Sequence, residues 1–118
     1  MMPKFKAFLK DTNQVLDVEI IFFELGIVKL TNNEFYEFED VVLMQSTGLH
    51  DKNGVETFEW DILTSQDGTD GLISRFIVKR DEFYTGFIPM NRDGYGFNRK
   101  MCEVIGNTCQ HPELLEDV

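Results

Sequence analysis

Apolar and polar residues alternate along most of the chain, with the period of two that a β-strand shows when one face meets a core. This pattern predicts strands over residues 4–9, 15–31, 34–45, 55–63, 72–80, 83–90 and 97–106. Gly26 divides the second range into two strands, one of them buried on both sides near Ile20 to Phe23. Polar turn signals at residues 11–14, 31–34, 66–71 and 91–96 separate the segments.

Residues 34–45 change from alternation to a continuous apolar run at Val41 to Met44. The change predicts a strand that runs from the rim of a sheet into the core, and a short helical turn over residues 34–40 is the alternative. Residues 55–63 alternate cleanly, with Val55, Thr57, Glu59 and Asp61 on one side and Glu56, Phe58, Trp60 and Ile62 on the other. The second set should face inward, except at Glu56.

The C-terminal residues differ from the rest of the chain. Pro112 followed by Glu113 is typical of the first turn of a helix, which predicts a short C-terminal helix; an ordered tail anchored by Leu114 and Leu115 is the alternative. The fold class expected is therefore all-β, as a small barrel or compact sandwich with a candidate SH3-like element, ending in a short helix. We expect one domain over residues 1–118; two small β lobes with a boundary near residues 64–71 are the alternative.

The charge excludes some classes of partner. Asp and Glu number 21 against 11 Lys and Arg, a formal net charge of −10, which repels phosphate backbones and makes nucleic acid an unfavourable partner. No apolar run approaches the ~20 residues that span a bilayer, and Lys6 and Lys10 interrupt what would have to be a signal peptide. We expect no membrane association and a cytoplasmic location in a bacterial cell.

The residues that could hold a metal are few. Cys102 and Cys109 are expected to be free thiols, because seven positions along a continuous strand would place them on opposite faces. A zinc site would need about four ligands, and His50 and His111 stand at unhelpful spacing from the cysteines. The sequence therefore predicts no metal and no cofactor.

Asn53 and Gly54 are predicted to form a hairpin turn, since both residue types accept positive φ. Together with Asp51 they also resemble the start of a calcium loop. That loop needs glycine at its sixth position, and here the glycine stands at the fourth, so the hairpin is preferred.

No catalytic residues are predicted. Glu59 and Asp61 share the outward face of a strand, where solvated carboxylates are the ordinary case. Ser46, Thr47 and His50 have no spacing that would predict a base beside a nucleophile. An enzyme is the least supported class of function.

A local basic and aromatic group is the candidate interaction surface: Arg92, Tyr95, Phe97, Arg99 and Lys100. Aromatic and cationic side chains side by side are typical of surfaces on which single-stranded nucleic acid stacks. Ion pairs on an ordinary surface are the more frequent outcome in an acidic protein.

Three stretches of the chain, residues 4–18, 43–63 and 102–116, resemble the YopX-like phage and prophage proteins. The central and C-terminal signatures are carried by Leu43, Met44, Gln45, Thr47, Gly48, Leu49, Asp51, Lys52, Asn53, Gly54, Glu59, Asp61 and Ile62, and by Val104, Ile105, Gly106, Asn107, Pro112, Glu113, Leu114 and Leu115. Trp60 stands where that family usually has glycine. The resemblance implies a mainly β, self-associating phage or prophage protein without catalytic residues.

The leading hypothesis is thus an accessory protein that acts without catalysis, by homo-oligomeric assembly or by binding a host or phage protein. Seven aromatic residues exceed what a small core needs and hint at subunit contacts, although filling the core is an equal alternative: Phe22, Phe23, Phe35, Tyr36, Phe83, Tyr84 and Phe87. Two further hypotheses are an acidic decoy that mimics DNA and occupies a host nucleic-acid enzyme, and a β-barrel nucleic-acid-binding module.

Overall fold

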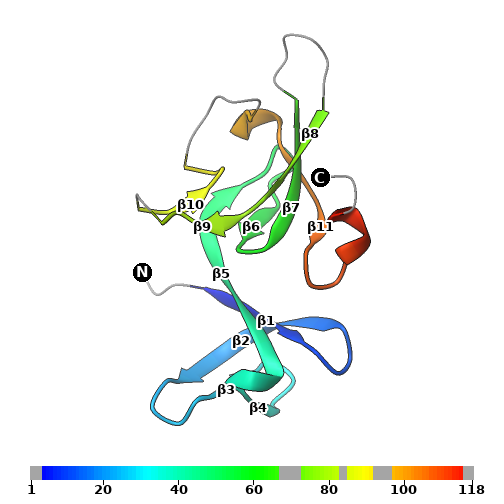
Figure 1. Ribbon diagram of the computed structural model, residues 1–118. Helices are drawn as coiled ribbons and strands as arrows, with labels where there is room; N and C mark the ends of the chain where they lie inside the picture. The colour runs from blue at the N-terminus through cyan, green and yellow to red at the C-terminus, as the bar shows by residue number, and fades with distance from the viewer. Residues whose placement is uncertain (1–3, 67–72, 83–84, 92–96, 116–118) are drawn as a thin grey trace. The chain divides into compact units, whose positions relative to one another are not determined.

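The computed structural model of the chain describes residues 4–66, 73–82, 85–91 and 97–115 (Figure 1). The chain divides into two compact units, Met1–Ser46 and Thr47–Val118. Both are built mainly from antiparallel β-strands, which confirms the predicted fold class. Residues 64–66 of the segment predicted as a boundary belong to a strand, and residues 67–71 lie outside the described residues.

In the first unit, short turns connect consecutive antiparallel strands. Its elements are β1 (Phe5–Leu9), β2 (Gln14–Phe22), β3 (Ile27–Leu30), β4 (Phe35–Glu37), the 3₁₀ turn η1 (Phe38–Asp40) and the first part of β5 (Val41–His50). They are hydrogen-bonded in the order β4-β3-β2-β1-β5. The helical alternative for residues 34–40 is thus present in part, as η1.

Small and branched side chains fill the core of the first unit: Ala7, Leu9, Val28, Leu30 and Val41. The second half of β2 was predicted to be buried on both sides, and this is wrong. Ile20 is 41% exposed and Phe23, which follows β2, is 73% exposed. Strand β1 pairs with β2 only between Gln14 and Asp17, so the rest of β2 has β3 as its remaining partner, and pairing within one sheet covers neither face of a strand.

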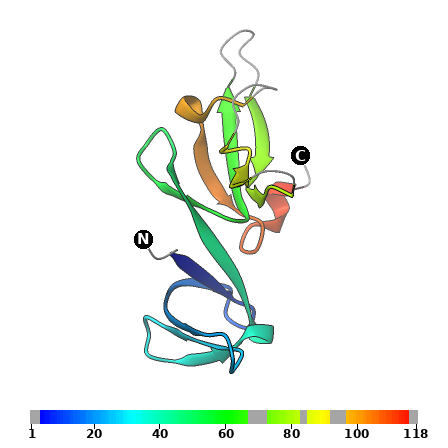
Figure 2. The same cartoon turned by 90° about the vertical axis from the view of Figure 1, so that its left-hand side faces the viewer.

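The second unit is a three-stranded antiparallel sheet with additional short elements (Figure 2). Its elements are the end of β5, β6 (Glu56–Phe58), β7 (Asp61–Gln66), β8 (Ile73–Ile77), β9 (Lys79–Arg80), β10 (Phe87–Ile88), η2 (Arg99–Met101), β11 (Glu103–Asn107) and η3 (Pro112–Leu115). The sheet order is β11-β7-β8, while β9 pairs with β10 and β5 with β6. The predicted C-terminal helix is only the 3₁₀ turn η3.

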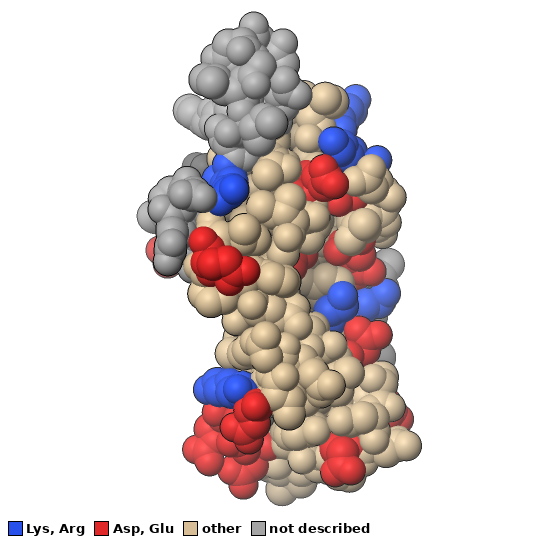
Figure 3. Space-filling model, turned by 90° about the vertical axis from the view of Figure 1, so that its right-hand side faces the viewer, with Lys and Arg blue, Asp and Glu red and all other residues tan. Residues whose placement is uncertain are grey.

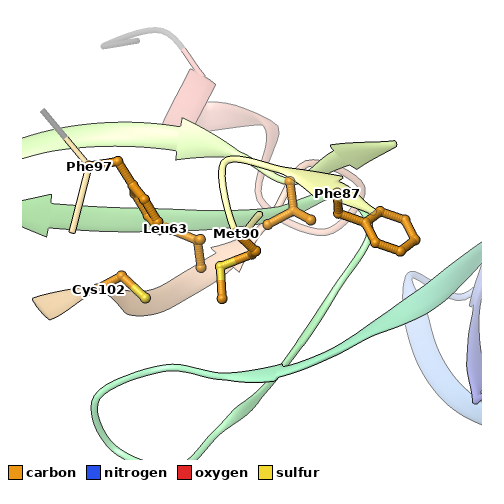
Figure 4. Close-up of a cluster of buried hydrophobic side chains, with 6 residues drawn as sticks. Leu63, Phe87, Met90, Phe97 and Cys102 are labelled. Carbon is orange, nitrogen blue, oxygen red and sulfur yellow. The ribbon is translucent and has the colours of Figure 1, made fainter. Parts of the chain in front are cut away.

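The core of the second unit gathers side chains from segments far apart in the sequence: Leu63, Val78, Phe87, Met90, Phe97 and Cys102 (Figure 4). The ring of Phe76 packs edge-on against Phe97 with 5.2 Å between centroids. The predicted strand ranges 55–63, 72–80, 83–90 and 97–106 thus bury apolar side chains in one common core.

The predicted strand over residues 55–63 is two strands, because the chain bends between β6 and β7. Trp60 lies at the bend with φ +74°, in the left-handed region that side chains other than glycine rarely adopt. Burial does not alternate as predicted: Thr57, in β6 before the bend, is 0% exposed, and Asp61, after the bend, is 8% exposed.

Candidate functional site

The central signature turn joins β5 to β6, and one buried carboxylate organises it. Asp51 Oδ1 accepts hydrogen bonds from the backbone N–H groups of Asn53 and Val55, both at 2.9 Å. Its Oδ2 accepts a third, from Val104 N on β11, at 3.0 Å. Asn53 and Gly54 lie in this turn, where Gly54 has φ +81° and donates its N–H to the Asp51 carbonyl.

These hydrogen bonds set the charge state of Asp51. Burial by itself raises the pKa of this carboxyl group, but the backbone N–H groups of Val104, Val55 and Asn53, with Lys52 nearby, outweigh burial and hold the pKa below its ordinary value. An ionised carboxylate whose oxygens already accept three backbone donors has little capacity left for a substrate or an ion. The turn is therefore a structural device that fastens the hairpin to β11.

Other polar residues of the central signature are also satisfied within the unit. The Thr47 and Thr57 hydroxyls contact each other, and the Thr57 hydroxyl donates to the Leu49 carbonyl at 3.0 Å. Asp61, predicted to be solvated, is buried and accepts the Phe58 N–H at 2.8 Å. These bonds brace the bend that interrupts the predicted strand.

The C-terminal signature has the same structural character. Asn107 Oδ1 accepts the N–H groups of Cys109 and Gln110 at 3.1 and 2.7 Å, and the Asn107 N–H donates to His111 Nδ1 at 3.2 Å. Gly106 allows this closure, because a Cβ at that position would lie 2.7 Å from His111 Nδ1. Both signatures thus describe how the second unit folds.

The candidate interaction surface is placed only in part. Phe97 is 3% exposed and belongs to the core, so its side chain is not part of a surface. Lys100 is exposed within η2, which begins at Arg99, and its N–H donates to Asn98 Oδ1. Arg92 and Tyr95 lie outside the described residues.

A different group of side chains forms an exposed surface in the first unit. We call Phe22, Phe23, Leu25, Phe35 and Phe38 the aromatic tip. Phe23, Leu25 and Phe35 are 73%, 70% and 56% exposed, although they are large and apolar. Ring contacts join the tip into pairs, Phe22 with Phe35 at 6.3 Å and Phe23 with Phe38 at 6.4 Å between centroids.

The backbone holds the aromatic tip in place. The turn between β2 and β3 closes with a 2.9 Å hydrogen bond from Gly26 N to the Phe22 carbonyl, and Gly26 has φ +67°. Phe38 N then donates to the Gly26 carbonyl at 2.9 Å, which fastens η1 to that turn. Phe23 and Leu25 therefore project from a fixed turn, and Phe35 projects from the paired strand β4.

The aromatic residues singled out in the sequence divide between exposed and buried positions. Phe23 and Phe35 are exposed, whereas Phe87 is buried in the core of the second unit. Tyr36 packs against the core of the first unit while its hydroxyl accepts a hydrogen bond from Asn32 Nδ2. Phe83 and Tyr84 lie outside the described residues. For Phe23 the sequence signal was the apolar run before Gly26, which predicted a buried strand; for Phe35 it was the alternation at the start of residues 34–45.

Acidic side chains surround the aromatic tip. Glu24 lies within the β2–β3 turn, and Glu34, Glu37, Glu39 and Asp40 flank β4 and η1. Acidic side chains gather over this end of the first unit in the space-filling view (Figure 3). Lys10 and Lys29 also lie near this end, so the rim is mainly but not wholly acidic. Charge of mainly one sign around an apolar surface favours partners of the opposite sign.

The search for other kinds of site gives negative results within the described ranges. Among the residues that the structure describes, no three His, Cys, Asp or Glu side chains are grouped so that they could hold a metal ion. Cys102 and Cys109 are thiols and not disulfide-bonded, and burial raises the pKa of the Cys109 thiol. No helix in the described part of the chain has the length and apolar character needed to cross a membrane.

The fold and both signatures define a class of mainly β proteins whose distinctive residues are structural. The family model described as YopX protein matches residues 4–116, so this chain belongs to the YopX family. Among solved structures, protein EF1440 from Enterococcus faecalis is similar over 98% of this chain and 99% of its own, with 25% identity and a TM-score of 0.70. No curated protein matches the chain.

Proposed function

We propose that this protein is a phage or prophage accessory protein that acts without catalysis, by binding a protein partner through the aromatic tip. The observation that carries the proposal is the exposure of Phe23 and Leu25 on the fixed β2–β3 turn and of Phe35 on β4, the strand that pairs with β3. Single exposed apolar residues are normal on protein surfaces, but a contiguous aromatic group is typical of an interface. Membership of the YopX family supports the phage context.

The size of the tip limits what it can do alone. Burying a large apolar side chain contributes about 1.5–3 kcal/mol, so the three most exposed residues supply at most about 5–9 kcal/mol. Association costs about 4–15 kcal/mol in lost freedom of motion. The tip is therefore an anchor within a larger interface, and the polar residues around it must contribute to affinity.

A photo-crosslinking amino acid in place of Leu25 tests the proposal in bacterial cells that make the protein. We expect a discrete adduct with another protein, which disappears when Phe23→Ser and Phe35→Ser are introduced into the same chain. The matched control is the same crosslinker at Val55, an apolar residue of the second unit that is 48% exposed. Identical adducts from both positions, or none from Leu25, would contradict the proposal.

Homo-oligomeric assembly is the second candidate, because the same aromatic tip offers an apolar surface to another copy of the chain. In the crosslinking experiment, an adduct that contains only this protein would favour assembly over binding of a different partner. Light scattering on the purified protein at micromolar concentration is the independent measurement. A monomer there would exclude stable assembly and leave the first candidate.

A further inference from the structure

An open pocket of about 340 Å³ lies at the aromatic tip of the first unit. Leu25, Gly26, Glu37, Phe38 and Glu39 line it. The hydrogen bond from Phe38 N to the Gly26 carbonyl joins the two segments that form the lining. The pocket therefore combines an apolar wall, an aromatic ring and two carboxylates on a backbone that is already fixed.

The carboxyl groups of Glu37 and Glu39 lie close enough to share a hydrogen bond, and they repel each other when both are ionised. A side-chain hydrogen bond from Glu39, and then the charges of Glu39 and Asp40, raise the pKa of Glu37 above its ordinary value. Lys10 Nζ, the amine that reaches this segment, donates to the backbone carbonyl of Glu39 at 2.8 Å. Within the described residues, the ion pairs found do not include Glu37, Glu39 or Asp40. A cation that entered the pocket would relieve this repulsion.

We propose that the pocket takes a lysine or arginine side chain from a partner protein, whose neighbouring apolar residues lie on Phe23, Leu25 and Phe35. This inference rests on the proposed function and specifies the chemistry of the partner: a polypeptide segment in which basic and apolar residues stand side by side. The cationic group lies between Glu37 and Glu39, and its aliphatic stem covers Leu25 and Phe38.

Three physical effects favour this occupant over others. A guanidinium or ammonium group near the Phe38 ring gains cation–π attraction and pairs with a carboxylate at the same time. The apolar stem fits a wall that a bare metal ion would leave in contact with water. A nucleic acid would bring phosphates towards carboxylates, which is unfavourable. A peptide segment with basic and apolar residues can contact Leu25, the Phe38 ring and the carboxylates at the same time.

Fluorescence anisotropy with synthetic peptides tests this inference on the full chain. The probe is a short labelled peptide in which arginine alternates with leucine; the comparison peptides replace arginine by glutamate, or leucine by serine. We expect binding of the first peptide only, weakened by added salt. Glu37→Gln combined with Glu39→Gln should reduce its affinity roughly tenfold.

The matched control is Glu82→Gln combined with Glu113→Gln, which removes the same charge from exposed positions in the second unit. Its affinity for the arginine peptide should stay within about twofold of the original. Equal weakening by both double variants, equal binding of all three peptides, or no binding of the arginine peptide would overturn the inference. The proposed function would then stand or fall separately, on the crosslinking from Leu25.

Discussion

Two turns of this protein carry carboxylates and a glycine with positive φ, yet they differ in where their polar and apolar groups point. At the central signature turn, Asp51 is 7% exposed and accepts three backbone N–H groups of the second unit. At the turn between β2 and β3, Phe23 and Leu25 are at least 70% exposed, and the carboxylates nearby crowd one another. The polar groups of the first turn are hydrogen-bonded within the unit, whereas the second turn exposes large apolar side chains to solvent.

This difference separates a turn whose polar residues hold the fold together from a turn whose apolar residues are left exposed. In the central signature, the Asp51 carboxylate connects the turn before β6 to β11. A match to that signature therefore predicts a fold. The aromatic tip lies in residues 22–38, outside the three stretches that carry the family resemblance. Experiments can test the separation by comparing what each turn contributes to stability.

The largest effect is expected from Asp51→Ala. It leaves three backbone N–H groups of a buried turn without their acceptor, and hydrogen bonds to a charged group contribute about 1.5–3 kcal/mol each. Allowing for relaxation, we expect a loss of about 3–5 kcal/mol in the free energy of unfolding, measured by chemical denaturation. Lys52→Ala is the control, since it removes an exposed pair with Glu103 and a weak attraction to Asp51 but no hydrogen bond to the Asp51 carboxylate, and it should cost less than about 1 kcal/mol. Equal costs would show that the Asp51 bonds are not structural.

The same carboxylate should give the protein a dependence on pH. Because the pKa of Asp51 is lowered in the folded chain, its contribution is fully present above the ordinary value of 3.8 and is lost as pH falls through the lower folded value. The stability difference between the original chain and Asp51→Asn should therefore shrink on acidification. Denaturation curves for both chains from about pH 6 to about pH 2 measure this. A difference that stays constant would contradict the assigned charge state.

Gly106→Ala is expected to cost about 1–3 kcal/mol. The new Cβ would lie 2.7 Å from Nδ1 and 3.0 Å from Cγ of His111, so the imidazole must move and its hydrogen bond with Asn107 N is lost. Thermal unfolding of the single variant and of the double variant with His111→Ala measures this effect. The cost of the alanine should fall in the double variant, because the atom that it meets is gone. An unchanged cost would mean that the strain lies elsewhere.

Trp60 gives a smaller effect with an unusual sign. At φ +74° a Cβ is unfavourable, so Trp60→Gly should be more stable than Trp60→Ala by about 1 kcal/mol, the reverse of the order in regular strands. Both variants lose the tryptophan side chain, and the comparison between them isolates the backbone. The hydrogen bonds from Trp60 N to the Val78 carbonyl and from Thr108 N to the Trp60 carbonyl hold this conformation. If alanine is the more stable, the bend does not constrain φ in solution.

The sequence predicted the mainly β fold and most strands well, because alternation and turn residues are local signals. Val15 to Thr31 divides at Gly26 as expected, and β1 lies within the predicted range. Local signals could not reveal the bend at Trp60, since an unbroken alternation over residues 55–63 continues across it. Nor could they reveal how much of β2 pairs with β1, which depends on the register between the strands.

The candidate site was predicted less well for the same reason. Phe97 stands beside charged residues in the sequence, but packing against Phe76 places it in a core. Phe23 stands in an apolar run that favours burial, but it follows the end of β2, beyond the residues that pair with β1. Exposure of an apolar residue is decided by tertiary packing, which composition and periodicity do not contain.

The smallest expected effect on stability, and the sharpest test of the comparison, comes from the aromatic tip. Phe23→Ser and Phe35→Ser should each change the free energy of unfolding by less than about 1 kcal/mol, because both side chains are more than half exposed. Chemical denaturation measures this, with Phe97→Ser in the core as a contrast that should cost about 3 kcal/mol or more. If the tip variants were as costly as the core variant, the aromatic residues would be structural like Asp51, and the distinction between the two turns would fail.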